Sequence, residues 1–399
     1  MRNKSYIDQY PVESAFYSKI KRLGLINIEL SERCNNNCRH CYIIRSFEAP
    51  HPHKKELSVA ALKGHLRDFA SFGWFVARFT GGEPLLRPDF EELYIYAREL
   101  GFKVVLSTNA CLITERLARL FRRIPLLEEI DITLYGMSRG PYEAVSRASG
   151  SFDAATKGIK ILLKNKIPFL VNFSVLPFNM HEVGRFRKWH KKMFPSDRFP
   201  VINVFLDRHV RRDPFRNDCI NDLRLSPEQG LRVIPSQKAD FVRDMQYALN
   251  APARAPDRRL FSCGAGKGGL CLDPYGKLYP CLSLRHPKTE YDLINGSIRE
   301  AYDSFFPAMR RMTVNSPAYL ARCARCFLKP ACSQCPAKSW MENGVLDSPA
   351  EYFCGVAHAQ AVSLGLLREK EKSWEVKDWR TRVRKFLKGA MDEKKGGSG

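Results

Sequence analysis

The 399-residue sequence predicts an α/β fold: a partial barrel of strand–helix units, followed by a small cysteine-rich domain. Two observations predict this arrangement. From residue 25 to about residue 235, short apolar runs alternate with stretches that have the i, i+3, i+4 apolar spacing of amphipathic helices. From Cys263 onward this periodicity fades and Gly, Pro and Cys punctuate the chain, which favours a region held together by metal rather than by a large core.

Six apolar runs are predicted to be strands, and helical patterns separate them. Such alternation produces a parallel sheet with right-handed crossovers. Because a closed barrel needs eight units, six units predict a partial (β/α)6 barrel of the TIM type, with active-site residues at the carboxyl ends of its strands. The predicted strands are Ile26–Leu30, Phe75–Thr80, Lys103–Ser107, Ile130–Leu134, Phe169–Val175 and Val201–Leu206.

Local residues mark the ends of several predicted helices. Ser58 is a predicted N-cap and Gly101 a predicted stop, and Ser226 followed by Pro227 predicts a helix with proline in its first turn. The changes of pattern along the sequence divide the chain into five segments. They are an N-terminal extension (1–24), the partial barrel (25–235), a linker (236–262), the cysteine-rich domain (263–357) and a basic helical tail (358–399).

The tail has an apolar face opposite its Lys and Arg residues. We expect this face to pack on its own protein rather than to dock a substrate or contact a membrane. Its apolar residues are Val376, Trp379, Val383 and Phe386.

Composition restricts the classes of partner. The first ten residues lack the apolar segment of a secretory signal, and no run of about 18 apolar residues occurs, so we expect a cytoplasmic protein with no membrane partner. The net charge of +23 suits an acidic peptide, nucleic acid or an anionic redox partner, and it is also compatible with a merely solvated surface. No nucleic-acid-binding module is recognisable, so we expect no nucleic-acid partner.

Thirteen cysteines in such a chain indicate metal or redox chemistry rather than disulfides. Cys34, Cys38 and Cys41 directly follow the first predicted strand. Their C-x₃-C-x₂-C spacing lets one loop ligate three irons of a [4Fe–4S] cluster and leaves the fourth iron open. A zinc site is the alternative, but structural zinc needs four ligands, and only histidines within and beyond the loop offer a fourth.

A Gly-Gly-Glu-Pro sequence, Gly81 to Pro84, ends the second predicted strand. Paired glycines allow a ligand to approach the backbone closely, and the carboxylate of Glu83 can accept hydrogen bonds from an ammonium group. By itself this sequence is also typical of a turn.

The cysteine triad and the Gly-Gly-Glu-Pro motif together resemble the radical S-adenosylmethionine (SAM) superfamily. The resemblance implies that SAM binds the open iron and that its reductive cleavage gives a 5′-deoxyadenosyl radical, which abstracts hydrogen from a substrate. The motif would hold the SAM amino group, Arg147 the carboxylate, and His40 would lie beside the adenine, where the family usually has an aromatic residue. Arg147 could equally be a surface arginine. The SAM contacts implied are His40, Gly81, Gly82, Glu83, Pro84, Ser107, Asn109, Thr133 and Arg147.

Eight further cysteines lie in the C-terminal region. Two C-x₂-C pairs by themselves suggest zinc, but the gap between the pairs is short for a zinc ribbon and four cysteines would be left over. Eight thiols divide naturally into two fully ligated [4Fe–4S] clusters. The eight are Cys263, Cys271, Cys281, Cys323, Cys326, Cys332, Cys335 and Cys354.

This second set resembles the SPASM domain that follows many radical SAM domains. Gly276, the C-x₂-C-x₅-C run and the Asn295–Ile298 loop match, whereas the final pair, Cys332 and Cys335, has two intervening residues where the domain usually has three. The resemblance implies two ligand sets, Cys263, Cys271, Cys281 and Cys335 for one auxiliary cluster and Cys323, Cys326, Cys332 and Cys354 for the other.

Fully ligated auxiliary clusters favour electron transfer and therefore a net two-electron oxidation. Proteins of this layout are mostly peptide maturases, which implies oxidative modification of a ribosomally made precursor peptide with an acidic leader, and a reductant such as flavodoxin or ferredoxin. The alternatives are a small-molecule substrate (an aminoglycoside or tetrapyrrole) and sulfatase maturation, for which an acidic residue is expected where this chain has Leu282. An iron–sulfur electron carrier or a metal-stapled binding protein is a further alternative, but such a protein would need neither the open cysteine triad nor the Gly-Gly-Glu-Pro motif. By topology, we expect Tyr135, Asn172, Ser174 and Asp207 to line the cavity.

Overall fold

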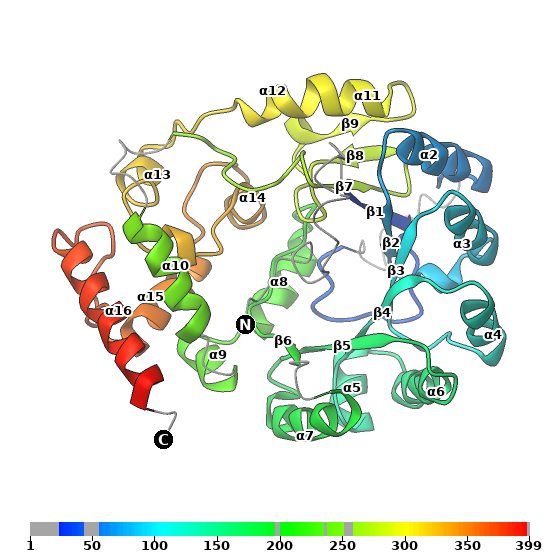
Figure 1. The fold of residues 1–399 in the computed structure, drawn as a ribbon, viewed down its shortest axis with the longest axis horizontal. Helices are drawn as coiled ribbons and strands as arrows, with labels where there is room; N and C mark the ends of the chain where they lie inside the picture. Colours follow the sequence, from blue (N-terminus) through cyan, green and yellow to red (C-terminus); the bar gives the residue numbers. More distant parts are fainter. Residues whose placement is uncertain (1–23, 44–55, 196–199, 235–237, 251–257, 397–399) are drawn as a thin grey trace. The chain divides into compact units, whose positions relative to one another are not determined.

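Figure 1 shows the computed structural model, which describes residues 24–43, 56–195, 200–234, 238–250 and 258–396. These residues form two compact units. The sheet unit comprises the described residues of 24–224 and 263–310, and the helical unit comprises those of 225–262 and 311–396. The predicted N-terminal extension lies outside the described residues except for Gly24.

The described strands of the sheet unit form a single nine-stranded sheet in the order β6-β5-β4-β3-β2-β1-β7-β8-β9. Neighbours from β6 to β7 are parallel, and β8 and β9 add an antiparallel edge. The strands are β1 Leu25–Ser31, β2 Val76–Gly81, β3 Lys103–Thr108, β4 Leu127–Leu134, β5 Phe169–Ser174, β6 Val201–Asn203, β7 Gly269–Leu272, β8 Lys277–Tyr279 and β9 Tyr291–Asp292.

All six predicted strands are present, but the sixth is shorter than predicted. The prediction of Val201–Leu206 is wrong at its end, because β6 stops at Asn203. The physical reason is packing: Leu206 leaves the sheet and joins a buried cluster with Ile220 and Leu223. The sequence pattern also did not predict that β7 pairs with β1 and so lengthens the parallel sheet.

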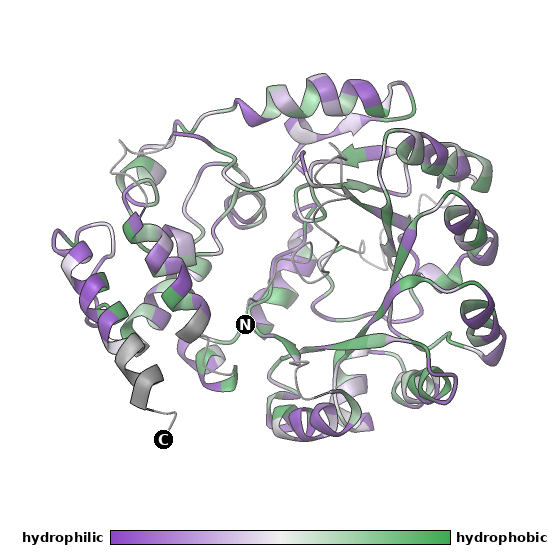
Figure 2. Ribbon diagram, viewed as in Figure 1, coloured by the Kyte–Doolittle hydropathy of each residue, from purple (hydrophilic) through white to green (hydrophobic). Residues whose placement is uncertain are grey.

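Helices cover the outer face of the curved sheet (Figure 1). Phe79 of β2 contacts Phe90 of α3 and Phe173 of β5 contacts Phe186 of α7, so alternate strand residues form the core beneath these helices. Figure 2 shows both hydrophilic and hydrophobic segments on the covering helices. The α-helices of this unit are α2 Val59–Ser71, α3 Phe90–Glu99, α4 Glu115–Arg123, α5 Arg139–Ser146, α6 Ser151–Lys164, α7 Val183–Met193, α8 Pro214–Leu223, α11 Ile298–Glu300 and α12 Phe306–Arg310.

Short helical turns complete the sheet unit. The 3-10 helices are Pro84–Leu86, Met180–Glu182 and Pro287–Thr289, and a π-helical turn spans Ala301–Phe305.

The predicted helix signals are confirmed. The Ser58 side chain accepts a hydrogen bond from the backbone N–H of Ala61 and so caps α2. Ser226 and Gln229 form a capping box at the start of α9, with Pro227 in its first turn. Gly101 has a φ of +89° just after the end of α3, a conformation that favours glycine.

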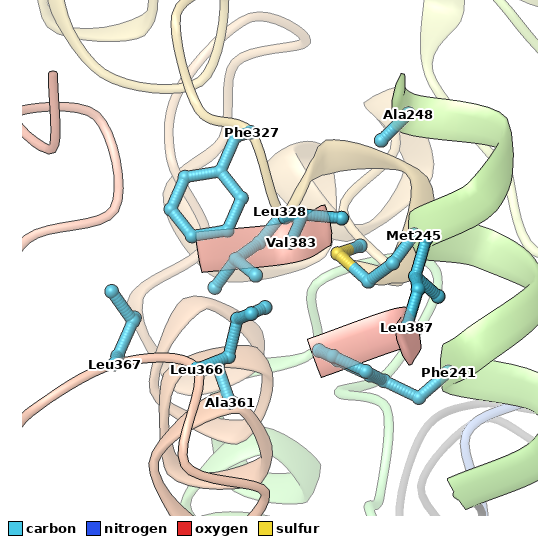
Figure 3. Packing of buried hydrophobic residues seen from close by; sticks show 10 residues of the cluster. All are labelled: Phe241, Met245, Ala248, Phe327, Leu328, Ala361, Leu366, Leu367, Val383 and Leu387. Atoms are coloured by element: carbon cyan, nitrogen blue, oxygen red, sulfur yellow. The ribbon is translucent and has the colours of Figure 1, made fainter. Parts of the chain in front are cut away.

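The helical unit is built around three helices, α10, α15 and α16. Its α-helices are α9 Pro227–Val233, α10 Lys238–Asn250, α13 Pro317–Ala321, α14 Pro336–Asn343, α15 Glu351–Ser363 and α16 Trp379–Gly396, and Lys329–Ala331 is a 3-10 helix. Figure 3 shows its core. The buried residues are Phe241, Met245, Ala248, Phe327, Leu328, Ala361, Leu366, Leu367, Val383 and Leu387.

Two predicted segments have their counterparts in this unit. The predicted linker, 236–262, contains helix α10, because Phe241, Met245 and Ala248 recur on one helix face and are buried. The apolar face of the tail packs on its own unit, as predicted, with Val383 fully buried. No helix in the described parts of the chain is long and apolar enough to cross a membrane.

Candidate functional site

The first cysteine group lies at the carboxyl edge of the parallel sheet, in the loop after β1. Two backbone hydrogen bonds attach this loop to the end of α5: Asn37 N–H donates to Ser146 C=O at 2.9 Å and Arg39 N–H donates to Val145 C=O at 3.1 Å. The same edge carries the end of β2 and its Gly-Gly-Glu-Pro motif. The parallel sheet therefore brings the two predicted motifs together.

The thiols of this loop lie within electrostatic reach of one another. Burial raises the pKa of the Cys34 thiol to about 12, and Glu83 and Cys41 raise it further against hydrogen bonds from Asn36 and Asn109. Burial also raises the pKa of Cys38, with Cys41 and Cys34 adding to the effect. Thiols in such surroundings lose their protons when they bind a metal cation. These cysteines therefore suit the role of thiolate ligands to an iron–sulfur cluster.

Two arginines hold the cysteine loop through Asn37. Arg147 donates to the Asn37 backbone carbonyl and to its side-chain oxygen, both at 2.7 Å. Arg216 of α8 donates to the Cys38 carbonyl and to the Asn37 side-chain oxygen, both at 3.2 Å. Arg147, predicted as a contact of the SAM carboxylate, therefore contacts the loop itself in this structure. Arg216 was not predicted, because nothing in the local sequence of α8 marks its approach to a loop far away in the chain.

Glu83 is fully buried behind the loop. Its carboxylate accepts hydrogen bonds from the Thr108 hydroxyl at 2.8 Å, the Asn109 backbone N–H at 2.8 Å and the Leu85 N–H at 3.2 Å. Burial nevertheless raises the pKa of Glu83 to about 7, and the three hydrogen bonds oppose this rise. A buried carboxylate in this state gains stability from a nearby cation such as an ammonium group.

The two glycines of the motif allow another segment of the same chain to approach their backbone closely. A Cβ on Gly81 would lie 2.3 Å from the Ser31 carbonyl oxygen, and one on Gly82 would lie 2.0 Å from that of Arg33. The N–H of Gly82 donates to Ser31 C=O and the N–H of Glu83 donates to Arg33 C=O, both at 2.8 Å. The close approach that the glycines permit is therefore to the segment between β1 and the cysteine loop.

The remaining predicted SAM contacts divide into two groups. Asn109 lies at the loop: its amide donates to the Asn35 side-chain oxygen at 2.7 Å and lies 3.8 Å from the Cys34 sulfur. His40 is half-buried, with its ring edge-on to Tyr135 at 5.3 Å. Desolvation lowers its pKa to about 4, which favours the neutral imidazole.

Ser107 and Thr133 lie deeper, on β3 and β4. Ser107 accepts a hydrogen bond from Arg78 at 3.1 Å, and Arg78 also forms an ion pair with Asp131 at 2.9 Å. Asn172, opposite Thr133 in the sheet, donates to Asp131. Together these side chains make a polar cluster on the face of the sheet opposite the core. Of its members, Arg78 and Asp131 were not predicted, because single charged residues in apolar strands give no pattern.

The other predicted cavity residues lie at the end of a strand or beyond it. Burial raises the pKa of the Cys38 thiol, and the nearby phenol of Tyr135 opposes this rise. The backbone carbonyl of Ser174 accepts a hydrogen bond from Asn179 at 2.8 Å. Asp207 lies close enough to Tyr42 to raise the pKa of its phenol, after the larger effect of burial.

Three of the eight C-terminal cysteines belong to the sheet unit. Cys271 lies on β7 opposite Asn27 of β1, so its backbone is part of the sheet. The guanidinium of Arg285 lies 3.3 Å from the Cys271 sulfur, donates to the Cys281 carbonyl at 3.3 Å and pairs with buried Glu29 at 2.6 Å. Cys263 is exposed. Cys335, the fourth predicted ligand of this set, belongs to the helical unit, so this ligand set stays a prediction.

The other predicted ligand set comes together within the helical unit. Cys323, Cys326, Cys332 and Cys354 line one cavity, together with Arg322, His358 and Trp374. Burial raises the pKa of Cys323 to about 12 and that of Cys332 to about 11, and neighbouring thiols add to both. Four half-buried cysteines around one cavity provide the donor set of a fully ligated cubane.

Among the described residues, no three Cys, His, Asp or Glu side chains converge closely enough to hold a single metal ion. In a cubane each thiolate binds a different iron, so the four ligands stand around a cluster rather than around one ion. The chemistry of the donors and their shared cavity are therefore the observations that favour a cluster at these sites.

The part of the chain that carries the first cysteine group and the Gly-Gly-Glu-Pro motif is similar to a known protein family. Residues 28–190, which contain the triad, the Gly-Gly-Glu-Pro motif, the second half of β1 and all of β2 to β5, match the model of the radical SAM superfamily. These residues form a radical SAM domain. The recognition made from the two motifs is confirmed, and a radical SAM domain implies one [4Fe–4S] cluster and SAM.

Relatives extend the likeness beyond this domain. The chain is 23% identical over 332 residues to the AdoMet-dependent heme synthase of Methanosarcina barkeri, covering 80% of this chain and 93% of the relative. It is 25% identical over 325 residues to the subtilosin biosynthesis protein AlbA of Bacillus subtilis, covering 79% of this chain and 67% of AlbA.

A solved structure shares the fold. Streptococcus suis SuiB, bound to its precursor peptide SuiA, matches with a TM-score of 0.59 at 15% identity over 86% of this chain and 78% of SuiB. At this identity the likeness concerns the fold alone. The predicted fold class, a radical SAM partial barrel in an α/β protein, is confirmed.

Proposed function

We propose that this radical SAM protein oxidises a ribosomally made precursor peptide, removing two electrons. The observation that carries the proposal is the cavity lined by Cys323, Cys326, Cys332 and Cys354, which the chain has in addition to the Cys34–Cys41 loop. Four thiolates saturate a cubane, so a cluster there transfers electrons rather than binding substrate. An oxidation needs such an acceptor, because abstraction of a hydrogen atom removes only one of the two electrons.

The residues of the chain have defined tasks in this proposal. Bound SAM and its cluster supply the radical that abstracts hydrogen. Arg147 and Arg216 hold Asn37, and through it they keep the cysteine loop in place. Glu83 offers a buried carboxylate to the SAM ammonium group, and the neutral ring of His40 offers an apolar face to the adenine.

The peptide substrate rests on relatives and on charge. AlbA is named for the biosynthesis of a bacteriocin, mycofactocin maturase MftC is a further relative at 26% identity, and SuiB is seen with a precursor peptide. A net charge of +23 suits an acidic leader peptide. The Arg78, Asp131 and Asn172 cluster supplies hydrogen-bond donors and acceptors of the kind that peptide groups use. Flavodoxin or ferredoxin is the proposed reductant.

The cofactors proposed are SAM and three [4Fe–4S] clusters, two of them auxiliary. The ligands of the first auxiliary cluster would be Cys263, Cys271, Cys281 and Cys335, and those of the second would be the four cysteines of the cavity. The test is anaerobic reconstitution of the full chain, which should then hold about twelve irons. Zinc without iron would refute the cluster assignment.

The triad is tested by replacing Cys34, Cys38 and Cys41 together with alanine. We expect the loss of about four irons and of all 5′-deoxyadenosine production, while about eight irons remain. Retained SAM cleavage would show that these cysteines do not hold the SAM cluster. The matched control is Cys219→Ala, since Cys219 on α8 belongs to none of the proposed ligand sets.

A tetrapyrrole is the second candidate substrate, because the relation to heme synthase covers four-fifths of the chain. The reconstituted enzyme, SAM and reductant should be incubated in parallel with small peptides encoded beside the gene and with tetrapyrrole carboxylic acids. A peptide that loses two hydrogens by mass spectrometry supports the proposal. Unchanged peptides together with an altered tetrapyrrole would overturn it.

A further inference from the structure

The segment between α15 and α16, residues 364–378, covers the four-cysteine cavity of the helical unit; we name it the cap. Ser373 is a buried residue of the cap, with 1% of its surface exposed. The Ser373 hydroxyl lies 2.9 Å from the sulfur of Cys326. When Cys326 is a thiolate, the hydroxyl is the only one of the two groups that has a proton to donate.

His358 fixes the position of Ser373. The backbone N–H of Ser373 donates to His358 Nε2 at 3.2 Å, so this nitrogen has no proton and the proton lies on Nδ1. Nδ1 then donates to the Cys354 carbonyl at 2.8 Å and lies 3.6 Å from the Cys354 sulfur. One imidazole thus connects the cap to a second cysteine of the same cavity.

Trp374 closes the cavity beside Ser373. Its ring lines the cavity, contacts His358 edge-on at 5.5 Å and packs against the guanidinium of Arg322 at 4.6 Å. Arg322 lies 3.7 Å from the Cys354 sulfur and pairs with Glu351 at 2.6 Å. The aromatic ring therefore shields both the thiols and the cation beside them.

Contacts in the middle of the cap and just beyond it hold the cap in place. Glu371 forms a two-point ion pair with Arg382 of α16, at 2.6 and 3.0 Å, and also accepts a hydrogen bond from the Arg368 N–H at 2.8 Å. Just beyond the cap, Trp379 at the start of α16 stacks on Phe327 with ring centroids 5.6 Å apart. The position of Ser373 is therefore set by the fold of the tail rather than by a free loop.

We propose that the cap sets the reduction potential of the second auxiliary cluster and protects it, with the Ser373 hydroxyl donating to the Cys326 thiolate. The inference rests on the proposed function, because it requires a cluster held by Cys323, Cys326, Cys332 and Cys354. Reduction adds negative charge to a cluster, so a hydrogen bond to a ligand sulfur stabilises the reduced state. Ser373 acts through Cys326 and is a positioning residue.

The test uses full-length protein with the three triad cysteines replaced by alanine, so that only auxiliary clusters remain. A redox titration followed by electron paramagnetic resonance then measures the reduction potentials of these clusters. The signal that disappears when Cys323 is also replaced by alanine belongs to the second auxiliary cluster. Ser373→Ala should shift the equilibrium between the oxidised and reduced cluster about tenfold towards the oxidised form. For one electron this lowers the reduction potential by about 59 mV. Ser373→Thr, which keeps the hydroxyl, should restore it.

The control is Ser363→Ala, because the Ser363 hydroxyl donates to the Gln360 carbonyl on the exposed end of α15. Trp374→Ala should bleach the same cluster several-fold faster in air. An unchanged couple in Ser373→Ala, with full iron content, would overturn the role of the cap alone. No loss of iron in Cys323→Ala would instead overturn the cluster itself, and the cap with it.

Discussion

Replacing Gly82 with alanine adds one carbon atom at the point where the Gly-Gly-Glu-Pro motif meets the cysteine loop. The added Cβ would lie 2.0 Å from the Arg33 carbonyl oxygen and 2.9 Å from that of Glu32. Both atoms belong to the backbone, so no side-chain rotation relieves the contact. The segment before Cys34 must move by about an ångström or more for an ordinary carbon–oxygen distance to be reached.

The cost has two parts. The forced backbone shift costs about 1–3 kcal/mol of unfolding free energy or more, as overpacking in rigid surroundings does. The hydrogen bonds from Gly82 to Ser31 and from Glu83 to Arg33 are also strained, and each contributes about 1 kcal/mol. We therefore expect Gly82→Ala to destabilise the protein by about 2–4 kcal/mol and to lose the iron of the triad first.

Gly64→Ala is the matched control. Gly64 lies in helix α2, and a Cβ there would meet nothing within 4 Å. This change should be neutral or should stabilise the protein by up to about 1 kcal/mol. The assays are urea unfolding of the cluster-free chain, iron content and 5′-deoxyadenosine production after reconstitution. A Gly82→Ala protein with the unfolding midpoint, iron content and SAM cleavage of the unchanged chain would refute the steric reasoning.

Two further changes test the helical unit. Leu387→Ala removes a buried side chain of α16 from the core that contains Phe241, and it should lower the unfolding free energy by about 2–5 kcal/mol. The control, Lys388→Ala, changes an exposed residue and should alter the unfolding free energy by less than about 0.5 kcal/mol. Calorimetry measures both changes. Ser226→Ala breaks the capping box of α9 and should cost about 1 kcal/mol in urea unfolding, whereas equal stability would contradict the cap.

The sequence predicted the sheet unit well where patterns are local. Apolar runs located both ends of β1, β2, β3 and β5 to within one residue, but missed the first three residues of β4. Ser58 and Ser226 located helix starts, because capping is decided within four residues. The pairing of β7 with β1 joins residues about 245 positions apart, and no local pattern records such a pairing. Helix α10 was predicted as a linker because flanking prolines and arginines obscured its apolar face.

The sequence predicted which cysteines gather in the candidate site but not what surrounds them. Their spacing grouped the triad in one loop and indicated the four cysteines that line one cavity, while their binding of clusters stays a prediction. The partners of these cysteines did not: Arg216 and Ser373 reach their cysteines from other elements, and Ser373 lies in the predicted tail. The glycines of the motif were associated with a ligand, whereas in the structure they accommodate the backbone of residues 31–33.

Each of the three cysteine groups has an arginine beside it. Arg216 contacts the triad loop, Arg285 lies 3.3 Å from the Cys271 sulfur and Arg322 lies 3.7 Å from that of Cys354. Thiolate-bound clusters are anionic, and burying an anion is costly unless a cation or hydrogen-bond donor is near.

At the two auxiliary groups, however, the arginine is shared with a carboxylate, Glu29 for Arg285 and Glu351 for Arg322. Each of these pairs carries little net charge, so it orients N–H groups towards sulfur without adding a free cation beside the thiols. Neutral donors of this kind stabilise a reduced cluster less than an unpaired arginine would. For the two proposed auxiliary clusters we therefore expect lower reduction potentials than an unpaired arginine beside the thiols would give.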